Sequence, residues 1–172
     1  IERPLIVAHL DNTAVFVNGD DTTGTLLATL SAGDYVSIPG TYFSTQSSSG
    51  SNPGGNMYVW TSKTAFAYQG IGGSANEANQ ELFFVPPLNC KTPKIINNIP
   101  LIQNTGSGSA IFSGGITIVT EVGASVLVNG AAITVSPQQV KNSTFETYLI
   151  TSLTGDVSVS SDKQIYVSYY GA

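Results

Sequence analysis

The single histidine and single cysteine of the chain limit the chemistry that its side chains can perform. A Ser-His-Asp arrangement needs a base, and the one candidate, His9, alternates with Val7 and Asp11 in a run typical of a strand. No Gly-x-Ser-x-Gly motif occurs. Cys90 lies in an apolar segment, where a lone thiol is most often a small buried hydrophobe. One histidine and one cysteine do not make a zinc site of the usual composition.

The acidic residues offer no pair suited to glycoside hydrolysis, which needs two facing carboxylates. Most of them lie at expected turns: Asp34 follows Ala-Gly and Asp156 follows Thr-Gly. An Asp at a turn usually accepts hydrogen bonds from nearby backbone groups. We therefore expect a protein that is not an enzyme and that uses no organic cofactor.

One loop tip, NGDDTTG at residues 18–24, gathers the oxygen ligands that hard cations prefer. Asp20 and Asp21 are adjacent there, and Asp11 lies in a neighbouring turn. The chain has no EF-hand or RTX spacing. The pattern is typical of a solvated polar turn, and the alternative is a structural calcium ion held by these three carboxylates.

Strand signals fill the chain. Short runs rich in Val, Ile, Thr and Tyr alternate with turn residues, and the one weak helical candidate is a single turn at 76–80. Such spacing is typical of a sandwich or barrel. We predict an all-β fold in which duplicated β units form a β-sandwich or jelly-roll-like body. The expected strands are residues 5–10, 14–18, 25–30, 35–39, 42–44, 56–61, 64–69, 82–85, 95–96, 101–104, 109–112, 115–121, 125–129, 131–135, 146–152, 156–160 and 164–169.

Two segments near the start of the chain recur in the same order near its end. IVAHLDNTAVFVNG (6–19) matches IVTEVGASVLVNG (118–130) with one residue deleted, and YVWTSKTAFAYQG (58–70) matches SVSSDKQIYVSYYG (158–171). This recurrence predicts an internal duplication of a β unit that cannot bury its apolar face alone. The expected parts of one compact body are a first β unit at 1–73, a connecting segment with strands at 74–112 and a second β unit at 113–172.

Each repeat contains an Asn-Gly pair after an apolar run, Asn18-Gly19 and Asn129-Gly130. A two-residue type I′ hairpin turn needs positive φ at both central positions, which Asn tolerates and Gly permits freely. The second pair predicts a tight hairpin. The first predicts the same turn with a longer tip, because DDTTG follows it.

Aromatic side chains distinguish the first repeat from the second. Tyr58 and Trp60 occupy the positions of Ser158 and Ser160, and serine marks the solvent face of a strand. These two aromatic residues are therefore expected to point away from the local core. They are either covered by the loop 44–56 or the second unit, or exposed as a platform for a sugar ring or a protein.

Tyr42 and Phe43 precede that loop and complete the set of candidate ligand-binding residues. The chain has a net charge of −5 and no basic stripe, which argues against nucleic acid or anionic lipid as a partner. No apolar run approaches the length of a membrane-spanning helix, so direct membrane insertion is not expected. The sequence starts at Ile1 and not at a methionine, so we expect a processed product or a piece of a larger protein.

Several motifs resemble the IgGFc-binding protein N-terminal domain family over most of the chain: ELFFVPPLNCKTP, INNIP, FSGGITIVT followed by VLVNG, and SSDKQIYVSYYGA. The resemblance implies an extracellular, adhesin-like setting in a long secreted or cell-surface bacterial protein with neighbouring domains. Antibody binding is not carried over, because no motif for it can be placed on residues of this chain.

The composition, the duplication and this resemblance together predict a non-enzymatic module that binds a cell-surface glycan or protein. The alternatives are a passive structural spacer of a surface protein and a carbohydrate-binding module attached to an enzyme.

Overall fold

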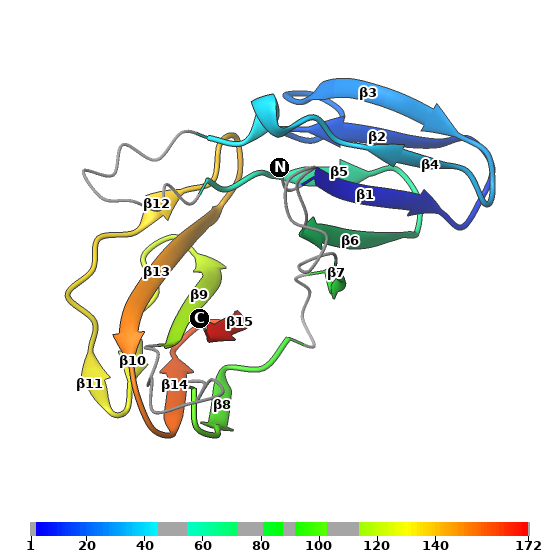
Figure 1. Cartoon of the computed structure of the whole chain (residues 1–172). Helices are drawn as coiled ribbons and strands as arrows, with labels where there is room; N and C mark the ends of the chain where they lie inside the picture. Colours follow the sequence, from blue (N-terminus) through cyan, green and yellow to red (C-terminus); the bar gives the residue numbers. More distant parts are fainter. Residues whose placement is uncertain (1–2, 45–54, 72–80, 88–91, 103–113, 172) are drawn as a thin grey trace. The chain divides into compact units, whose positions relative to one another are not determined.

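The computed structural model describes residues 3–44, 55–71, 81–87, 92–102 and 114–171. Its regular elements in these ranges are fifteen β-strands and one short 3-10 helix, which confirms the all-β prediction (Figure 1). Contacts divide the chain into two compact units. Unit 1 comprises Ile1–Pro87 and Val140–Ser143, and unit 2 comprises Leu88–Gln139 and Thr144–Ala172.

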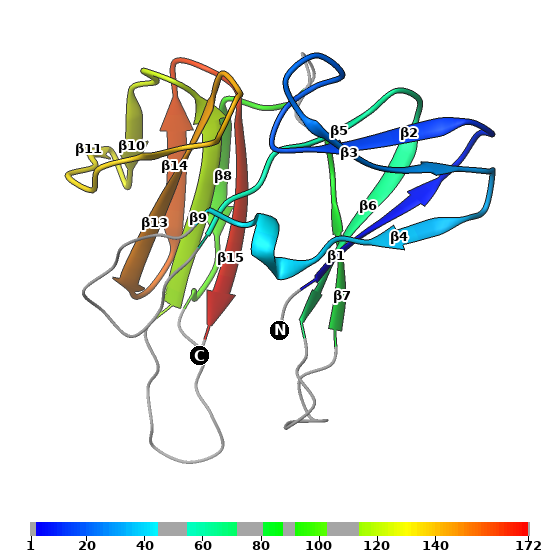
Figure 2. The same ribbon diagram turned by 90° about the horizontal axis from the view of Figure 1, so that it is seen from above.

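Unit 1 is a sandwich of two antiparallel sheets with strand orders β4-β1-β6-β7 and β3-β2-β5. Figure 2 shows the layer of β2 and β3 apart from the layer of β1, β4 and β7. The core between them is built from Ile6, Ala8, Val15, Val17, Leu30 and Ile38. The elements are β1 (Arg3–Ala8), β2 (Thr13–Val17), β3 (Thr25–Leu30), β4 (Tyr35–Ser37), η1 (Gly40–Tyr42), β5 (Val59–Thr61), β6 (Ala65–Ile71) and β7 (Glu81–Val85).

Unit 2 is a second sandwich, with strand orders β12-β13-β9-β15 and β11-β10-β14-β8. Its buried core is formed by Ile99, Ile102, Ile116, Ile118, Val126, Tyr148, Val157, Val159 and Ile165. The elements are β8 (Ile95–Ile99), β9 (Gly114–Glu121), β10 (Val126–Val128), β11 (Ala131–Ala132), β12 (Gln138–Gln139), β13 (Phe145–Leu153), β14 (Val157–Ser161) and β15 (Ile165–Gly171).

The two units repeat each other strand by strand, as the internal duplication predicts. β1 pairs with β4 and β6, and β9 pairs with β13 and β15. β2 pairs with β3 and β5, and β10 pairs with β11 and β14. β1 to β6 thus correspond in order to β9, β10, β11, β13, β14 and β15. β7, β8 and β12 are additions to this common plan.

The matching lysines of the two repeats have the same role. Lys63 Nζ donates a hydrogen bond of 2.7 Å to the Asp11 carbonyl, and Lys163 Nζ donates one of 2.6 Å to the Val122 carbonyl. The Asp11 carbonyl is in the turn between β1 and β2, and the Val122 carbonyl is in the equivalent turn between β9 and β10. An ammonium group is a strong donor to a turn carbonyl, so Lys63 ties that turn to the connection between β5 and β6, and Lys163 ties its turn to the connection between β14 and β15.

The Asn-Gly prediction is confirmed at Asn129-Gly130, whereas Gly19, with a φ of 153°, does not complete the type I′ turn expected after Asn18. Asn129 and Gly130 have φ values of 50° and 78° and join the paired residues Val128 and Ala131. Asn18 has a φ of 56°, but β2 and β3 first pair at Val17 and Thr25, so the turn has the longer tip.

Asn129→Ala is expected to lower the free energy of unfolding of unit 2 by about 1–2 kcal/mol. Alanine pays a steric cost at positive φ and loses the bond of 2.7 Å that Asn129 Oδ1 accepts from Ser158 N. Asn129→Gly is the matched control, because glycine removes only the hydrogen bond. Urea unfolding measures the difference. Equal stability of the alanine and glycine variants would show that the positive φ at position 129 has no steric cost for alanine.

Several strand predictions were wrong, each for a local reason. Residues 42–44 are not a strand, because Pro39 begins the 3-10 turn η1, in which Tyr42 N and Phe43 N donate to Pro39 O and Gly40 O. The strand expected at 131–135 is limited to β11 at Ala131–Ala132, and after it Ile133 N donates one long bond of 3.4 Å to Val126 O.

Further boundaries also differ. β5 begins at Val59 and not at residue 56, and Leu101 adopts a φ of 43° in a turn instead of starting a strand. β8 extends to Ile99, beyond the expected end at residue 96, and the short β12 was missed because its two glutamines carry no apolar signal. The expected strand at 109–112 and the helical turn at 76–80 lie outside the described residues.

Candidate functional site

The outer side of the sheet β4-β1-β6-β7 carries six apolar side chains. Ile6 and Ala8 point into the core, so Leu5 and Val7 on the same strand point outward. The strand register places the other members beside them, since Val7 lies opposite Tyr35 and Phe66, Leu5 lies opposite Tyr68, and Tyr68 lies opposite Phe84. We call this group the aromatic face. Its members are Leu5, Val7, Tyr35, Phe66, Tyr68 and Phe84.

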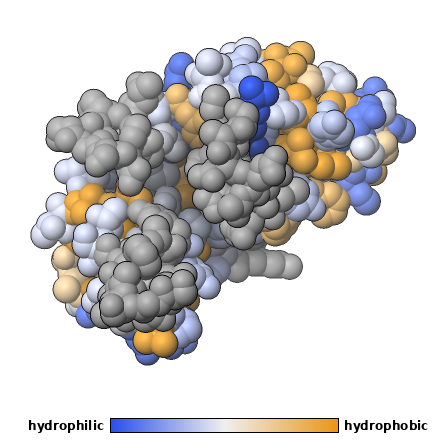
Figure 3. Space-filling model, in the orientation of Figure 1, coloured by the Kyte–Doolittle hydropathy of each residue, from blue (hydrophilic) through white to orange (hydrophobic). Residues whose placement is uncertain are grey.

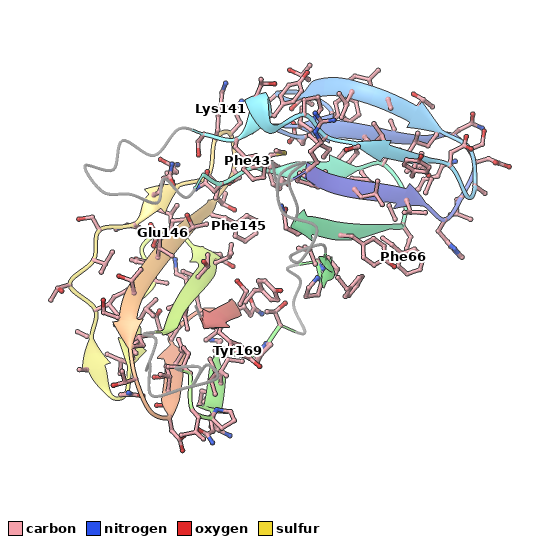
Figure 4. All side chains as sticks on the ribbon, in the orientation of Figure 1. Phe43, Phe66, Lys141, Phe145, Glu146 and Tyr169 are labelled. Atoms are coloured by element: carbon pink, nitrogen blue, oxygen red, sulfur yellow. The ribbon has the colours of Figure 1, made fainter. Side chains whose placement is uncertain are left out.

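The rings of the aromatic face are accessible. Tyr35, Phe66 and Phe84 are 68%, 43% and 51% exposed. The rings of Tyr68 and Phe84 meet edge to face at 5.8 Å, and His9 meets Phe66 in the same way at 6.0 Å. Figure 4 shows Phe66 on the side of β6 away from β2 and β3, and Figure 3 shows apolar residues, in orange, at the surface of unit 1. Contiguous exposed apolar groups of this kind mark interaction sites in soluble proteins.

The equivalent sheet of unit 2 is more polar on its outer side. The registers place Thr117, Thr147 and Ser168 where the aromatic face has Leu5, Tyr35 and Tyr68, whereas Val119 and Tyr166 correspond to Val7 and Phe66. The three strands that the two sheets share therefore differ in part on the side that does not build the core. Because the fold tolerates polar residues at these positions, the apolar residues of unit 1 are not required for the sandwich.

The sequence alone did not predict this surface, because its members come from four separate strands. The signal available was the alternation of Leu5 and Val7 with buried neighbours and of Phe66 and Tyr68 with small ones. That signal becomes a surface only when β1, β4, β6 and β7 are placed side by side.

A smaller apolar row lies on the outer side of the other sheet of unit 1. Met57 and Val59 pack against the core, so Trp60 points away from it, as predicted. Trp60 lies opposite Phe16 in the register, and their rings are 5.6 Å apart at an interplanar angle of 66°. Trp60 and Phe16 are half-buried, and Leu26, opposite Phe16 on the far side, is 54% exposed.

The structure does not bring all four aromatic candidates into one surface. Tyr42 packs partly against the core, and its carbonyl accepts a hydrogen bond of 2.9 Å from Asn18 Nδ2. Phe43, which follows η1, is half-buried. Tyr58 is also half-buried, and burial together with the negative charge of Asp20 raises its pKa. Trp60 is thus the member of the set that presents its ring outward beside a second aromatic ring.

Asp20 organises the loop that follows β2. Its Oδ1 accepts hydrogen bonds from the hydroxyl and backbone N–H of Thr22, at 2.7 and 2.9 Å, and from those of Thr23, at 2.9 and 3.0 Å. These donors, the Thr22 hydroxyl first, hold the pKa of Asp20 well below its ordinary value. The carboxylate therefore acts as the backbone acceptor expected of a turn Asp, and Asp21 beside it is exposed.

Asp11 lies far from these two carboxylates. It is in the turn before β2, where its Oδ1 accepts a hydrogen bond of 2.8 Å from Ala32 N, whereas Asp20 and Asp21 follow β2. The five residues of β2 separate the two turns by about 15 Å, too far to share one ion. In the part of the chain that the structure describes, no group of three or more His, Cys, Asp or Glu residues is placed to hold a metal ion.

A buried carboxylate in unit 2 has a structural role, which its hydrogen bonds define. Glu146 is 5% exposed and accepts hydrogen bonds from Tyr148 OH at 2.9 Å and from Gly123 N at 3.1 Å. Burial and the contact with Glu146 raise the pKa of Tyr148 to about 12. Gly123 is in the turn between β9 and β10, so the carboxylate ties that turn to β13.

No described helix is long and apolar enough to cross a membrane.

Comparison with known proteins places the chain in a family. Neither a curated protein nor a solved structure matches the chain. A family model described as IgGFc binding protein matches residues 3–171, nearly the whole chain, and agrees with the resemblance seen in its motifs. The chain belongs to the IgGFc binding protein family.

Proposed function

We propose that the chain is a non-enzymatic ligand-binding module of a secreted or cell-surface, adhesin-like bacterial protein. Membership of a family described by a binding activity supports a binding role. The observation that carries the proposal is the aromatic face, because an exposed apolar surface on one repeat, with a more polar counterpart on the other, has no structural need to be there.

The aromatic face has the physical properties of a recognition surface. Tyr and Phe rings provide large contact areas at low cost in conformational entropy, and a sheet holds them at fixed spacing. Polar groups lie at its margin, where Ser37 is opposite Leu5 and His9 touches Phe66. Flat rings with a polar rim suit a protein surface or the apolar side of a sugar ring.

Tyr35→Ser combined with Phe66→Ser is expected to weaken ligand binding tenfold or more, because both rings are exposed members of the aromatic face. The probes are an immobilised immunoglobulin Fc fragment, which the family description names, and an array of cell-surface glycans. Binding of parent and variant is measured by surface plasmon resonance and array fluorescence.

Tyr166→Ser is the matched control, since the register places Tyr166 on the outer side of β15, in the position equivalent to Phe66. This variant is expected to bind as the parent does. Binding of no probe would favour the passive spacer, and a double variant as active as the parent would place the site elsewhere. A response confined to polysaccharides would favour the carbohydrate-binding alternative.

A further inference from the structure

Among the described strands, one edge of unit 1 has no neighbour where the equivalent edge of unit 2 is paired. β5 corresponds to β14, and β14 pairs with β10 on one side and with β8 on the other. Among the described strands, β5 pairs with β2 alone and ends its sheet. Unit 2 therefore provides a template for the strand that would lie next to β5.

The hydrogen bonds of β5 show which backbone groups point to the open edge. Asn18 N donates to Tyr58 O at 2.7 Å, and Ser62 N donates to Ala14 O at 3.0 Å. Since alternate residues of a strand direct their backbone groups to the same side, those of Val59 and Thr61 point away from β2.

In unit 2 the corresponding backbone groups of β14 alternate in the same way, and those on the outer side bond to β8. Asn129 N donates to Ser158 O at 2.9 Å, on the side of β10, and Ser161 N donates to Lys94 O at 2.9 Å, on the side of β8. Ser161 is the counterpart of Thr61, and Val159, the counterpart of Val59, lies opposite Ile96. The backbone groups that receive β8 in unit 2 thus have counterparts at the open edge of β5.

The core side chains beside this edge are less buried in unit 1 than in unit 2. Val157 and Val159 of unit 2 are 1% and 0% exposed, with Ile99 of β8 in the core cluster and Ile96 packed against it. Their counterparts in unit 1, Met57 and Val59, are only partly buried. An additional strand with branched aliphatic side chains would remove these two side chains from water.

The chain between the two repeats supplies one additional strand to each unit. β7 follows β6 and pairs with it in unit 1, whereas β8 precedes β9 and pairs with β14 in unit 2. The six-strand plan is therefore extended by short segments from outside it. Such addition of an extended segment to a free sheet edge is an established mode of peptide recognition.

We propose that the open edge of β5 is an acceptor site for an extended polypeptide segment of another protein with the chemistry of β8. The segment runs antiparallel to β5 and exchanges backbone hydrogen bonds with Val59 and Thr61. It carries two branched aliphatic residues, spaced as Ile96 and Ile99, toward the core. This site is formed by the sheet β3-β2-β5 and is separate from the aromatic face.

The test uses the chain's own β8 sequence as a probe, the peptide TPKIINNIP of residues 92–100. Trp60, the single tryptophan, is the middle residue of β5 and reports binding there by fluorescence. A saturable change in Trp60 emission is expected. N-methylation of Ile96 in the peptide should weaken binding at least tenfold, because its amide faces the acceptor strand; N-methylation of Ile95, whose amide faces away, is the control.

Thr61→Pro is the protein variant that tests the edge. Proline removes an N–H that points away from β2 and is tolerated on edge strands, so the melting temperature should stay close to that of the parent while peptide binding is lost. The Tyr35→Ser and Phe66→Ser variant should bind the peptide normally, which separates this proposal from the proposed function. No saturable change up to about 1 mM peptide, or equal binding by the N-methyl-Ile96 peptide or by the proline variant, would overturn it.

Discussion

Replacing Ile118 by alanine is expected to lower the free energy of unfolding of unit 2 by about 3–4 kcal/mol. Ile118 is fully buried at the centre of β9, where it lies opposite Tyr148 on β13 and Val167 on β15. The substitution loses the transfer free energy of the removed carbon atoms and leaves a cavity that two flanking strands cannot close. Urea unfolding followed by circular dichroism measures the loss.

Two variants control this experiment. Val119→Ala removes methyl groups from the half-buried outer side of the same strand and should cost about 1 kcal/mol or less. Ile6→Ala changes the counterpart of Ile118 in unit 1, which is 2% exposed, and should shift the unfolding transition seen by Trp60 fluorescence. Equal losses for Ile118→Ala and Val119→Ala would contradict the assignment of the two sides of β9.

Raising the pH from 10 to 12 is expected to remove at most about 3 kcal/mol of stability through Tyr148. Burial and Glu146 raise the pKa of Tyr148 to about 12, above the ordinary tyrosine value near 10. The unfolded chain therefore loses this proton before the folded chain does, so stability is complete below pH 10 and declines through the folded pKa. Burial raises the pKa values of Tyr58 and Tyr166 as well, which adds to the decline.

Tyr148→Phe isolates the contribution of this hydroxyl group. At neutral pH the variant should be about 1–3 kcal/mol less stable, because the buried carboxylate of Glu146 loses one of its two donors. Between pH 10 and 12 its stability should fall less steeply than that of the parent. Tyr35→Phe, which changes an exposed hydroxyl group, should alter neither quantity measurably. An unchanged alkaline slope in Tyr148→Phe would show that other groups cause it.

The two repeats share one arrangement of strands but carry different side chains on their outer surfaces. Positions that face the core stay apolar in both units, as with Ile6 and Ile118. Positions that face outward are free to differ, as with Tyr68 and Ser168. Both proposed sites lie in unit 1, one on the outer side of β4-β1-β6-β7 and one at the edge of β5.

The elements of the fold were largely predictable, because their signals are local. β3 was expected with its observed bounds, and β1, β2, β6 and β9 within about two residues. Alternation of apolar residues selects a strand and its buried side without knowledge of its neighbours. The Asn-Gly pairs are equally local, since positive φ depends on the residues themselves.

The candidate site was predictable only in part. The outward direction of Trp60 followed from alternation with Val59 and from comparison with Ser160 in the second repeat. Its partner Phe16 did not, because the contact depends on the register of β2 with β5, formed by residues 44 positions apart. Tyr42 was grouped with Trp60 because it precedes the loop 44–56, but in the 3-10 turn its side chain packs partly against the core.

Most of the strands, the hairpin turn at Asn129-Gly130 and the recurrence of the β unit could be predicted without a structure, because each depends on short-range alternation, backbone preference or self-similarity. Only the tertiary structure decided which outward residues share a surface. Leu5 meets Tyr68 through strand pairing across a long stretch of chain. Within the described part of the chain, strand pairing also places β8 beside β14 and leaves β5 at the end of its sheet. Strand order is set by the burial of whole sheet faces, a collective free energy that no short segment of sequence contains.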